Sequence, residues 1–127
     1  MEPFTVYITG KISGLPEEEF KRNFILAADF LRTQGFDPVN PLDVIPECYE
    51  SCDSGLTFKD GTYQHHWQCY MKADLKVMLD CVGFFPLDNA ADSRGAKVEM
   101  GVAVEVGLIN VRDQLEEEWR LFKEAAA

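Results

Sequence analysis

Short runs of β-branched and aromatic residues alternate in this sequence with longer segments of helical period. The strand-like runs are Phe4–Thr9, Phe36–Val39, Cys81–Leu87 and Leu108–Val111. Each is followed by apolar residues that recur every three or four positions, or by a turn that leads into them. Strands separated by helices form a parallel sheet that is covered on both faces. Because crossovers are right-handed, we predict an α/β three-layer, flavodoxin- or Rossmann-like fold, with a parallel sheet of about four to five strands in an order near 2-1-3-4.

The helical segments have recognisable ends. The first follows Pro16 and an acidic turn, and Gly35 ends it; the others are predicted at Gln64–Asp80, from Ser93 to about Val106, and at Arg112–Ala126. Residues 42–63 have neither the helical nor the strand period. A connection of this length is uncommon in a compact domain and is usually functional or disordered. We therefore predict one domain over residues 1–127 with a flexible flap at 42–63.

Charge and composition exclude several classes of function. The chain of 127 residues has a formal net charge of −10, which disfavours binding to a nucleic acid polymer. No apolar run is long enough to span a bilayer, and the N-terminal residues lack the pattern of a secretory signal. We expect a cytoplasmic protein with free thiols and no cofactor. A zinc site built from Cys48, Cys52, His65, His66 and Cys69 is disfavoured, because their spacing is unlike that of structural zinc sites.

Two carboxylates stand on helix faces that are otherwise apolar. The neighbours of Glu99 at helical spacing are Ala96, Val102, Ala103 and Val106. Asp74 lies in the middle of a second apolar stripe, formed by Trp67, Tyr70, Met71, Leu75, Met78 and Leu79. Burying an ionised carboxylate without partners costs several kcal/mol. Either acid could cap a loop or pair with Arg94 or Lys97, but two such acids favour a site in which nucleophile and proton donor are separate groups.

The loops after the first and third strands are expected to lie side by side at the carboxyl end of the sheet, where ligands bind in such folds. The first loop is Gly10, Lys11, Ile12, Ser13 and Gly14, a glycine-bearing turn that could present backbone N–H groups to an anion. It matches neither the dinucleotide-binding nor the P-loop pattern, so an ordinary strand-to-helix turn is an equal alternative. Ser93 is either only a helix cap or, at the helix N-terminus, also a phosphate ligand.

Four short motifs in register resemble the nucleoside 2-deoxyribosyltransferase-like superfamily, and most closely its small bacterial and phage branch. They are Tyr7–Gly14 (YITGKISG), Asn40-Pro41, Tyr70–Leu75 (YMKADL) and Ser93–Glu99 (SRGAKVE). The resemblance implies that an N-glycosidic bond of a nucleoside or nucleotide is cleaved through a glycosyl-enzyme, in a homo-oligomer. It assigns Glu99 as nucleophile, Asp74 as the acid that assists departure of the base, and Tyr7 as the residue that positions Glu99. Ser93, Gly95 and the loop of Gly10 to Gly14 would then hold a 5′-phosphate, as in the nucleotide hydrolases of the superfamily.

Three functions stay open at this point. The first is an N-glycosidase or 2-deoxyribosyltransferase acting on a (deoxy)nucleoside or its 5′-monophosphate. The second is a module of the same fold that binds or sequesters a nucleotide without turnover. It is motivated by the long 42–63 segment and by Ala90, which stands where relatives usually have tryptophan. The third is a structural or assembly protein in which both acids only cap neighbouring groups.

Overall fold

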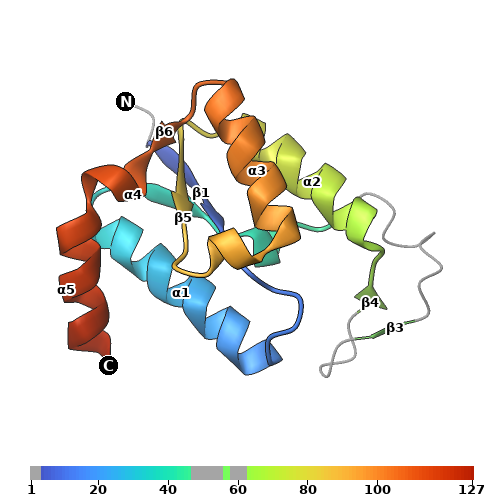
Figure 1. Cartoon of the computed structure of the whole chain (residues 1–127), viewed down its shortest axis with the longest axis horizontal. Helices are drawn as coiled ribbons and strands as arrows, with labels where there is room; N and C mark the ends of the chain where they lie inside the picture. The colour runs from blue at the N-terminus through green and yellow to red at the C-terminus, as the bar shows by residue number, and fades with distance from the viewer. Residues whose placement is uncertain (1–3, 47–55, 58–62) are drawn as a thin grey trace.

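A four-stranded parallel sheet forms the centre of the protein, seen here in a computed structural model that describes residues 4–46, 56–57 and 63–127. Its strands are β1 (Thr5–Thr9), β2 (Asp37–Val39), β5 (Gly83–Pro86) and β6 (Ile109–Asn110). They pair in the order β2-β1-β5-β6, and every pair is parallel. This order is the predicted 2-1-3-4, and helices cover both faces (Figure 1). The predicted three-layer α/β fold is therefore confirmed.

The central strand β1 sends alternate side chains to opposite layers. Val6 and Ile8 are fully buried on one face, while Tyr7 and Thr9 are buried on the other. Successive residues of a strand point to opposite faces, so this division follows from the pleat. A strand that is buried on both sides needs no solvent-facing polar position, which explains its continuous run of β-branched and aromatic residues.

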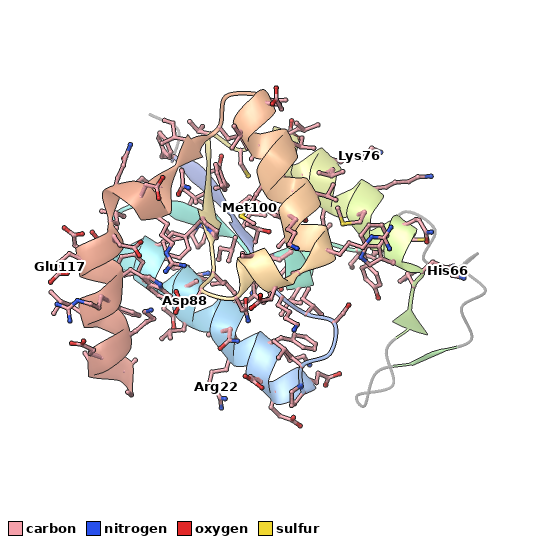
Figure 2. The ribbon with its side chains drawn as sticks, viewed as in Figure 1. Arg22, His66, Lys76, Asp88, Met100 and Glu117 are labelled. Carbon is pink, nitrogen blue, oxygen red and sulfur yellow. The ribbon has the colours of Figure 1, made fainter. Side chains whose placement is uncertain are left out.

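The first layer consists of α1 (Glu17–Thr33) and α5 (Glu116–Ala126), which lie together on one side of the sheet in Figure 1. The apolar stripe of α1 packs on Val6 and Ile8, and aromatic rings join the two helices. Trp119 of α5 is only 3% exposed and contacts Phe30 at a ring-centroid distance of 5.2 Å. Charged residues such as Arg22 and Glu117 project outward from these helices (Figure 2).

The second layer consists of α2 (Trp67–Leu79) and α3 (Arg94–Glu105), side by side on the opposite face (Figure 1). Their core is smaller and contains Tyr7, Met78, Cys81, Phe84 and Ala103. The thiols of Cys69 and Cys81 are free.

The predicted apolar stripes of these two helices were wrong at their C-terminal ends. Leu79 and Val106 are 51% and 53% exposed. Leu79 is the last residue of α2 and lies about 100° around the helix from the buried Met78. Val106 is the C-cap of α3, beyond its last full turn. In both helices, the buried apolar face therefore ends before the last apolar residue that the sequence period places on it.

The predicted flap has more structure than expected. Within 42–63, a 3-10 turn (Pro41–Asp43) precedes a small antiparallel pair, β3 (Leu56–Thr57) and β4 (Tyr63–Gln64). The predicted flap from residue 47 to 55 and from 58 to 62, with Cys48 and Cys52, lies outside the described residues.

The predicted C-terminal helix is two helices, α4 (Val111–Gln114) and α5. The break is at Leu115, whose φ of −124° leaves the helical range while its side chain packs against the core. Within the described residues, no helix is long and apolar enough to cross a membrane.

Candidate functional site

Glu99 points from α3 onto the sheet, as its helical neighbours predicted. The helix starts at Ser93, whose Oγ accepts a hydrogen bond of 3.2 Å from the backbone N–H of Ala96. Glu99 lies further along the same helix and is only 5% exposed. The Tyr7 hydroxyl donates to its Oε2 at 2.7 Å, and the Thr9 hydroxyl donates to its Oε1 at 2.7 Å. Each carboxylate oxygen thus has a hydroxyl donor from β1.

Thr9 is a site residue that the sequence alone did not reveal. It stands two positions after Tyr7, and residues two apart on a strand share a face. Its hydroxyl is buried, with 1% of the residue exposed, and it contacts Glu99 across 90 positions of sequence. A threonine in a strand is ordinary, so the usable signal was only its spacing from Tyr7.

Asp74 reaches the same region from α2. It is 8% exposed, and among the described residues its Oδ1 has no hydrogen-bond partner. Burial and the negative charge of Glu99 raise the pKa of Asp74 to about 8, although a hydrogen bond with Tyr7 opposes the change. At neutral pH this carboxyl group therefore holds its proton.

The other two groups of the cluster are perturbed as well. Burial raises the pKa of Glu99, and the hydrogen bonds from Tyr7 and Thr9 act against that rise. Burial and the two neighbouring carboxylates raise the pKa of Tyr7, so its phenol remains a proton donor. Because Glu99 has two donors and Asp74 Oδ1 has none, Glu99 is the acid of this pair that ionises first. The site thus combines a carboxyl group that is held by two hydroxyl donors with a second buried acid that keeps its proton at neutral pH.

The loops after β1 and β5 lie side by side, as the strand order requires. The backbone N–H of Lys11 donates to Asn89 Oδ1 at 3.0 Å, and that of Leu87 donates to the Thr9 carbonyl at 2.8 Å. Asn89 was not predicted as a site residue. Its amide holds the two loops together.

Only the tip of the predicted Gly10 to Gly14 anion loop is exposed. Gly10 is buried against Leu87, where a Cβ would come within 2.8 Å of the Leu87 Cγ. The Lys11 N–H is already bonded to Asn89, and the Ile12 side chain packs against the core beside α1. Ser13 and Gly14 are exposed at the tip, and Gly14 has a φ of +86° that favours glycine.

The N-terminal ends of α2 and α3 are in contact. The guanidinium carbon of Arg94 lies 4.1 Å from the centre of the Trp67 ring. Gly95 is half-buried against α2, and a Cβ there would lie 3.4 Å from Met71 Sδ and 3.7 Å from Trp67 Nε1. The contact of Trp67 with Arg94 was not predicted from the sequence.

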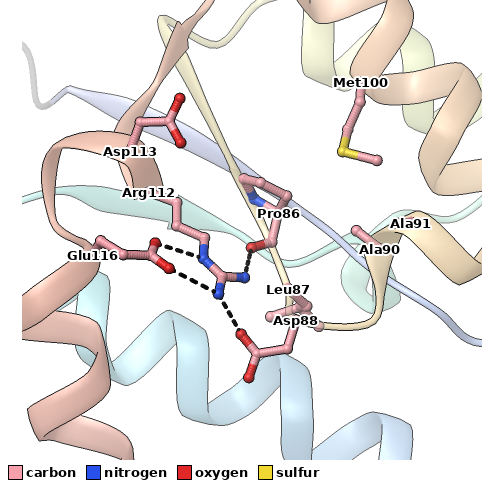
Figure 3. A pocket seen from close by; sticks show the side chains of 9 residues that line it. All are labelled: Pro86, Leu87, Asp88, Ala90, Ala91, Met100, Arg112, Asp113 and Glu116. Atoms are coloured by element: carbon pink, nitrogen blue, oxygen red, sulfur yellow. Dashed lines mark hydrogen bonds and ion pairs between the residues drawn. The ribbon is translucent and has the colours of Figure 1, made fainter.

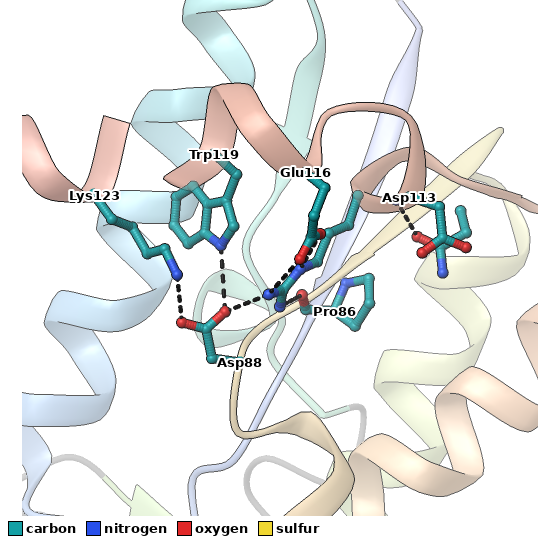
Figure 4. Close-up of polar contacts among 8 residues, drawn as sticks. Pro86, Asp88, Asp113, Glu116, Trp119 and Lys123 are labelled. Carbon is teal, nitrogen blue, oxygen red and sulfur yellow. Dashed lines mark hydrogen bonds and ion pairs between the residues drawn. The ribbon is translucent and has the colours of Figure 1, made fainter. Parts of the chain in front are cut away.

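A surface hollow of about 390 Å³ lies at the end of β5, between the loop after that strand and α4 (Figure 3). A second hollow lies between α1 and β2. Neither Glu99 nor Asp74 lines either of these two hollows. Arg112 donates to the Pro86 carbonyl at 2.8 Å and pairs with Asp88 and Glu116. Asp88 also accepts from Lys123 at 2.7 Å and from Trp119 at 3.4 Å (Figure 4). These charges neutralise one another, which indicates a structural role.

A model described as Domain of unknown function (DUF4406) matches residues 4–111. The chain belongs to this family. No curated protein and no solved structure matches it. The DUF4406 match includes Tyr7, Thr9, Asp74 and Glu99, whereas α5 lies beyond its end.

Proposed function

We propose that this protein cleaves, or transfers the sugar from, the N-glycosidic bond of a (deoxy)nucleoside 5′-monophosphate or nucleoside through a covalent Glu99 intermediate. One observation carries the proposal. A buried carboxylate with a hydroxyl donor on each oxygen lies beside a second buried acid, Asp74, whose pKa is about 8. Glycosidic cleavage with a covalent intermediate needs this division between nucleophile and acid.

The two acids divide the reaction between them. A Glu99 oxygen bonds to the anomeric carbon while the bond from that carbon to the base nitrogen breaks. The electron pair of the broken bond leaves with the base, and the proton of Asp74 neutralises it. Water, or the nitrogen of a second base, then bonds to the anomeric carbon and releases Glu99. The Asp74 carboxylate takes the proton that this nucleophile loses, so both acids return to their starting states.

Tyr7 and Thr9 are positioning residues in this scheme. Their hydroxyls hold both Glu99 oxygens, so the carboxylate cannot rotate freely. The same bonds favour the ionised form of Glu99 against the effect of burial. Losing either hydroxyl would make Glu99 a more easily protonated and less oriented nucleophile.

The start of α3 supports a phosphorylated substrate. Ser93 stands at the N-terminus of a 12-residue helix, where aligned peptide dipoles attract anions. Its Oγ accepts from Ala96, which leaves the hydroxyl proton to donate to a ligand oxygen. A carboxylate at this position would repel a phosphate, whereas serine can bind one.

A non-catalytic nucleotide-binding module is the second candidate. It is favoured by the enclosure of the acids, which are 5% and 8% exposed and line neither described hollow. Such a protein would bind a nucleotide and release it unchanged. A nucleotide would stabilise it against thermal unfolding although no base is released.

A nucleotide panel tests the proposal. The protein is incubated with nucleosides and 5′-monophosphates, with and without a free acceptor base, and released base is separated by chromatography. We expect base release that falls at least about 1,000-fold in Glu99→Gln, because covalent catalysis is lost. Glu105→Gln, an exposed glutamate of the same helix, is the matched control and should retain full activity.

Two outcomes would contradict the proposal. If the wild-type protein releases no base from any substrate but is thermally stabilised by a nucleotide, the binding module is the correct function. If Glu99→Gln releases base as fast as Glu105→Gln, Glu99 is not the nucleophile.

A further inference from the structure

We propose that Trp67 and Arg94 form the base-recognition wall of the site, with the Trp67 indole as a stacking surface for the nucleobase of the substrate. This inference rests on the proposed function, which it deepens by identifying what selects the base. It starts from the contact between the Arg94 guanidinium and the Trp67 ring, 4.1 Å from its centre.

The position of Trp67 relative to the acids supports this role. Trp67 is the first residue of α2, and Met71 and Asp74 follow at offsets of four and seven, on the same helical stripe. The backbone of Asp74 therefore lies about two turns, or roughly 10 Å along the helix axis, beyond that of Trp67. On α3, Gly95 precedes Glu99 by one turn on the same face, and a Cβ on Gly95 would lie 3.7 Å from Trp67 Nε1.

These offsets place Trp67 and Gly95 at the N-terminal ends of their helices, one to two turns before the two acids. The N-termini of α2 and α3 lie at the carboxyl edge of the sheet (Figure 1). Helix α3 begins there because it follows the carboxyl end of β5. Helix α2 also begins there, because it runs back across the sheet and ends where β5 starts. Ligands reach this kind of fold from that edge. A substrate whose anomeric carbon meets Glu99 has a base that projects from that carbon, and the half-buried Trp67 is an aromatic surface there.

The charge pattern of the helix starts is consistent with an anionic ligand. Helices α1 and α5 each begin with three glutamates, which suit the positive end of a helix dipole. In α2 and α3 the first turn has no acidic residue, and α3 begins with Arg94. A cation at this end of a helix is unfavourable unless something negative compensates for it. In a chain of net charge −10, this local cation favours a phosphorylated ligand.

The existing contact shows that the indole face accepts a flat partner. Arg94 is exposed, and an exposed cation–π contact is weaker than the stacking of a base on an aromatic ring. A base can therefore replace the guanidinium on the indole. The freed guanidinium remains beside the ligand, where its charge and planar donors suit the 5′-phosphate.

Intrinsic fluorescence tests this directly, because the chain has two tryptophans and Trp119 is only 3% exposed in the opposite layer. The full-length chain is titrated with nucleoside 5′-monophosphates and with deoxyribose 5-phosphate, which has no base. Glu99→Gln is used for the same titrations, so that turnover does not consume the ligand. We expect quenching by the nucleotides and none by the sugar phosphate.

Substitutions of Trp67 and Arg94 test whether the fluorescence quenching arises at these two residues. Trp67→Leu should abolish the quenching and raise the Kd, measured by equilibrium dialysis, about tenfold. Trp67→Phe keeps an aromatic ring, so it should bind nucleotides almost as tightly as the wild type but show no tryptophan quenching. Arg94→Gln should raise the Kd for nucleotides about threefold to tenfold. Arg22→Gln, which removes an exposed arginine of α1, is the control and should bind like the wild type.

The results separate this inference from the proposed function. Base release without quenching in the wild type overturns the Trp67 wall and leaves the proposed reaction standing. Quenching by nucleotides without base release supports the wall and overturns the reaction. Equal quenching by deoxyribose 5-phosphate overturns the wall, because the signal would then not depend on the base. The wild-type titration needs no variant, so a poorly folding Trp67→Leu protein does not remove the test.

Discussion

Asp74 is a buried acid whose proton links the site to stability. Burial raises its pKa from 3.8 to about 8, so the unfolded chain loses this proton at a much lower pH than the folded one. Between these values the folded state binds more protons, and stability therefore falls as pH rises, at up to about 1.4 kcal/mol per pH unit. We predict that Asp74→Asn is more stable than the wild type by about 2 kcal/mol or more at pH 8. The difference should vanish near pH 4.

Urea unfolding from pH 4 to 8 measures this difference. Asp80→Asn removes an exposed carboxylate from the C-cap of the same helix and should retain the wild-type slope. A difference between Asp74→Asn and the wild type that stays constant with pH would contradict the raised pKa.

At the residue scale, sequence reasoning located the two acids and Tyr7 but missed Thr9 and Asn89. Glu99 and Asp74 could be predicted because a charge on an apolar stripe breaks a regular pattern. Thr9 and Asn89 break no pattern, and their contacts join residues 90 and 78 positions apart. Such contacts depend on the final register of strands and loops, which a local pattern does not contain.

At the element scale, α3 contains a glycine that the site does not use. Gly101 lies on the exposed face of the helix, and a Cβ there would meet nothing within 4 Å. Alanine is favoured over glycine inside a helix by about 1 kcal/mol. We predict that Gly101→Ala stabilises the protein by about this amount, raises its thermal midpoint and leaves Glu99 in place.

A second glycine is the matched comparison. A Cβ on Gly83 of β5 would come within 2.8 Å of Val111 Cγ2 and 3.0 Å of the Ile109 carbonyl. Gly83→Ala should therefore destabilise the sheet where β5 meets β6. If both alanine variants shifted the thermal midpoint in the same direction, space around the Cβ would not be the deciding factor.

The ends of elements were harder to predict than their existence. Long amphipathic helices such as α1 give many periodic positions, whereas β3 and β4 have two residues each and no period to detect. The break at Leu115 was missed because the charged pattern runs on through it. Only the packing of Leu115 against the core shows why the backbone turns there.

At the scale of the whole molecule, α5 is joined to the loop that leads into the site. This helix lies beyond residues 4–111, which match the family, yet Lys123 and Trp119 both donate to Asp88. The next residue, Asn89, holds Lys11. The strand order could be predicted from crossover handedness, but the docking of α5 could not, because it depends on ion pairs between distant segments.

Asp88 responds to pH in the opposite sense to Asp74. Burial alone would raise its pKa, but Lys123, Arg112 and Trp119 outweigh burial and hold the pKa below its usual value. A lowered pKa contributes stability above the unfolded value of 3.8, and that stability is lost as pH falls through the folded pKa. We predict that Asp88→Asn costs about 1 kcal/mol at pH 7, a modest figure because the side chain is 55% exposed.

In urea unfolding, the cost of Asp88→Asn should shrink as pH falls below the unfolded pKa of 3.8 and disappear once the pH is below the lowered folded pKa, where the wild-type carboxyl is itself neutral. Glu117→Gln is the control: it breaks a pair with Arg120 inside α5, so it crosses no element boundary and should leave the unfolding midpoint unchanged. If the two variants behave alike, the contacts of Asp88 do not hold α5 to the sheet. If only Asp88→Asn is destabilised, the terminal helix supports the loop after β5, and through Asn89 the edge at which Glu99 and Asp74 meet.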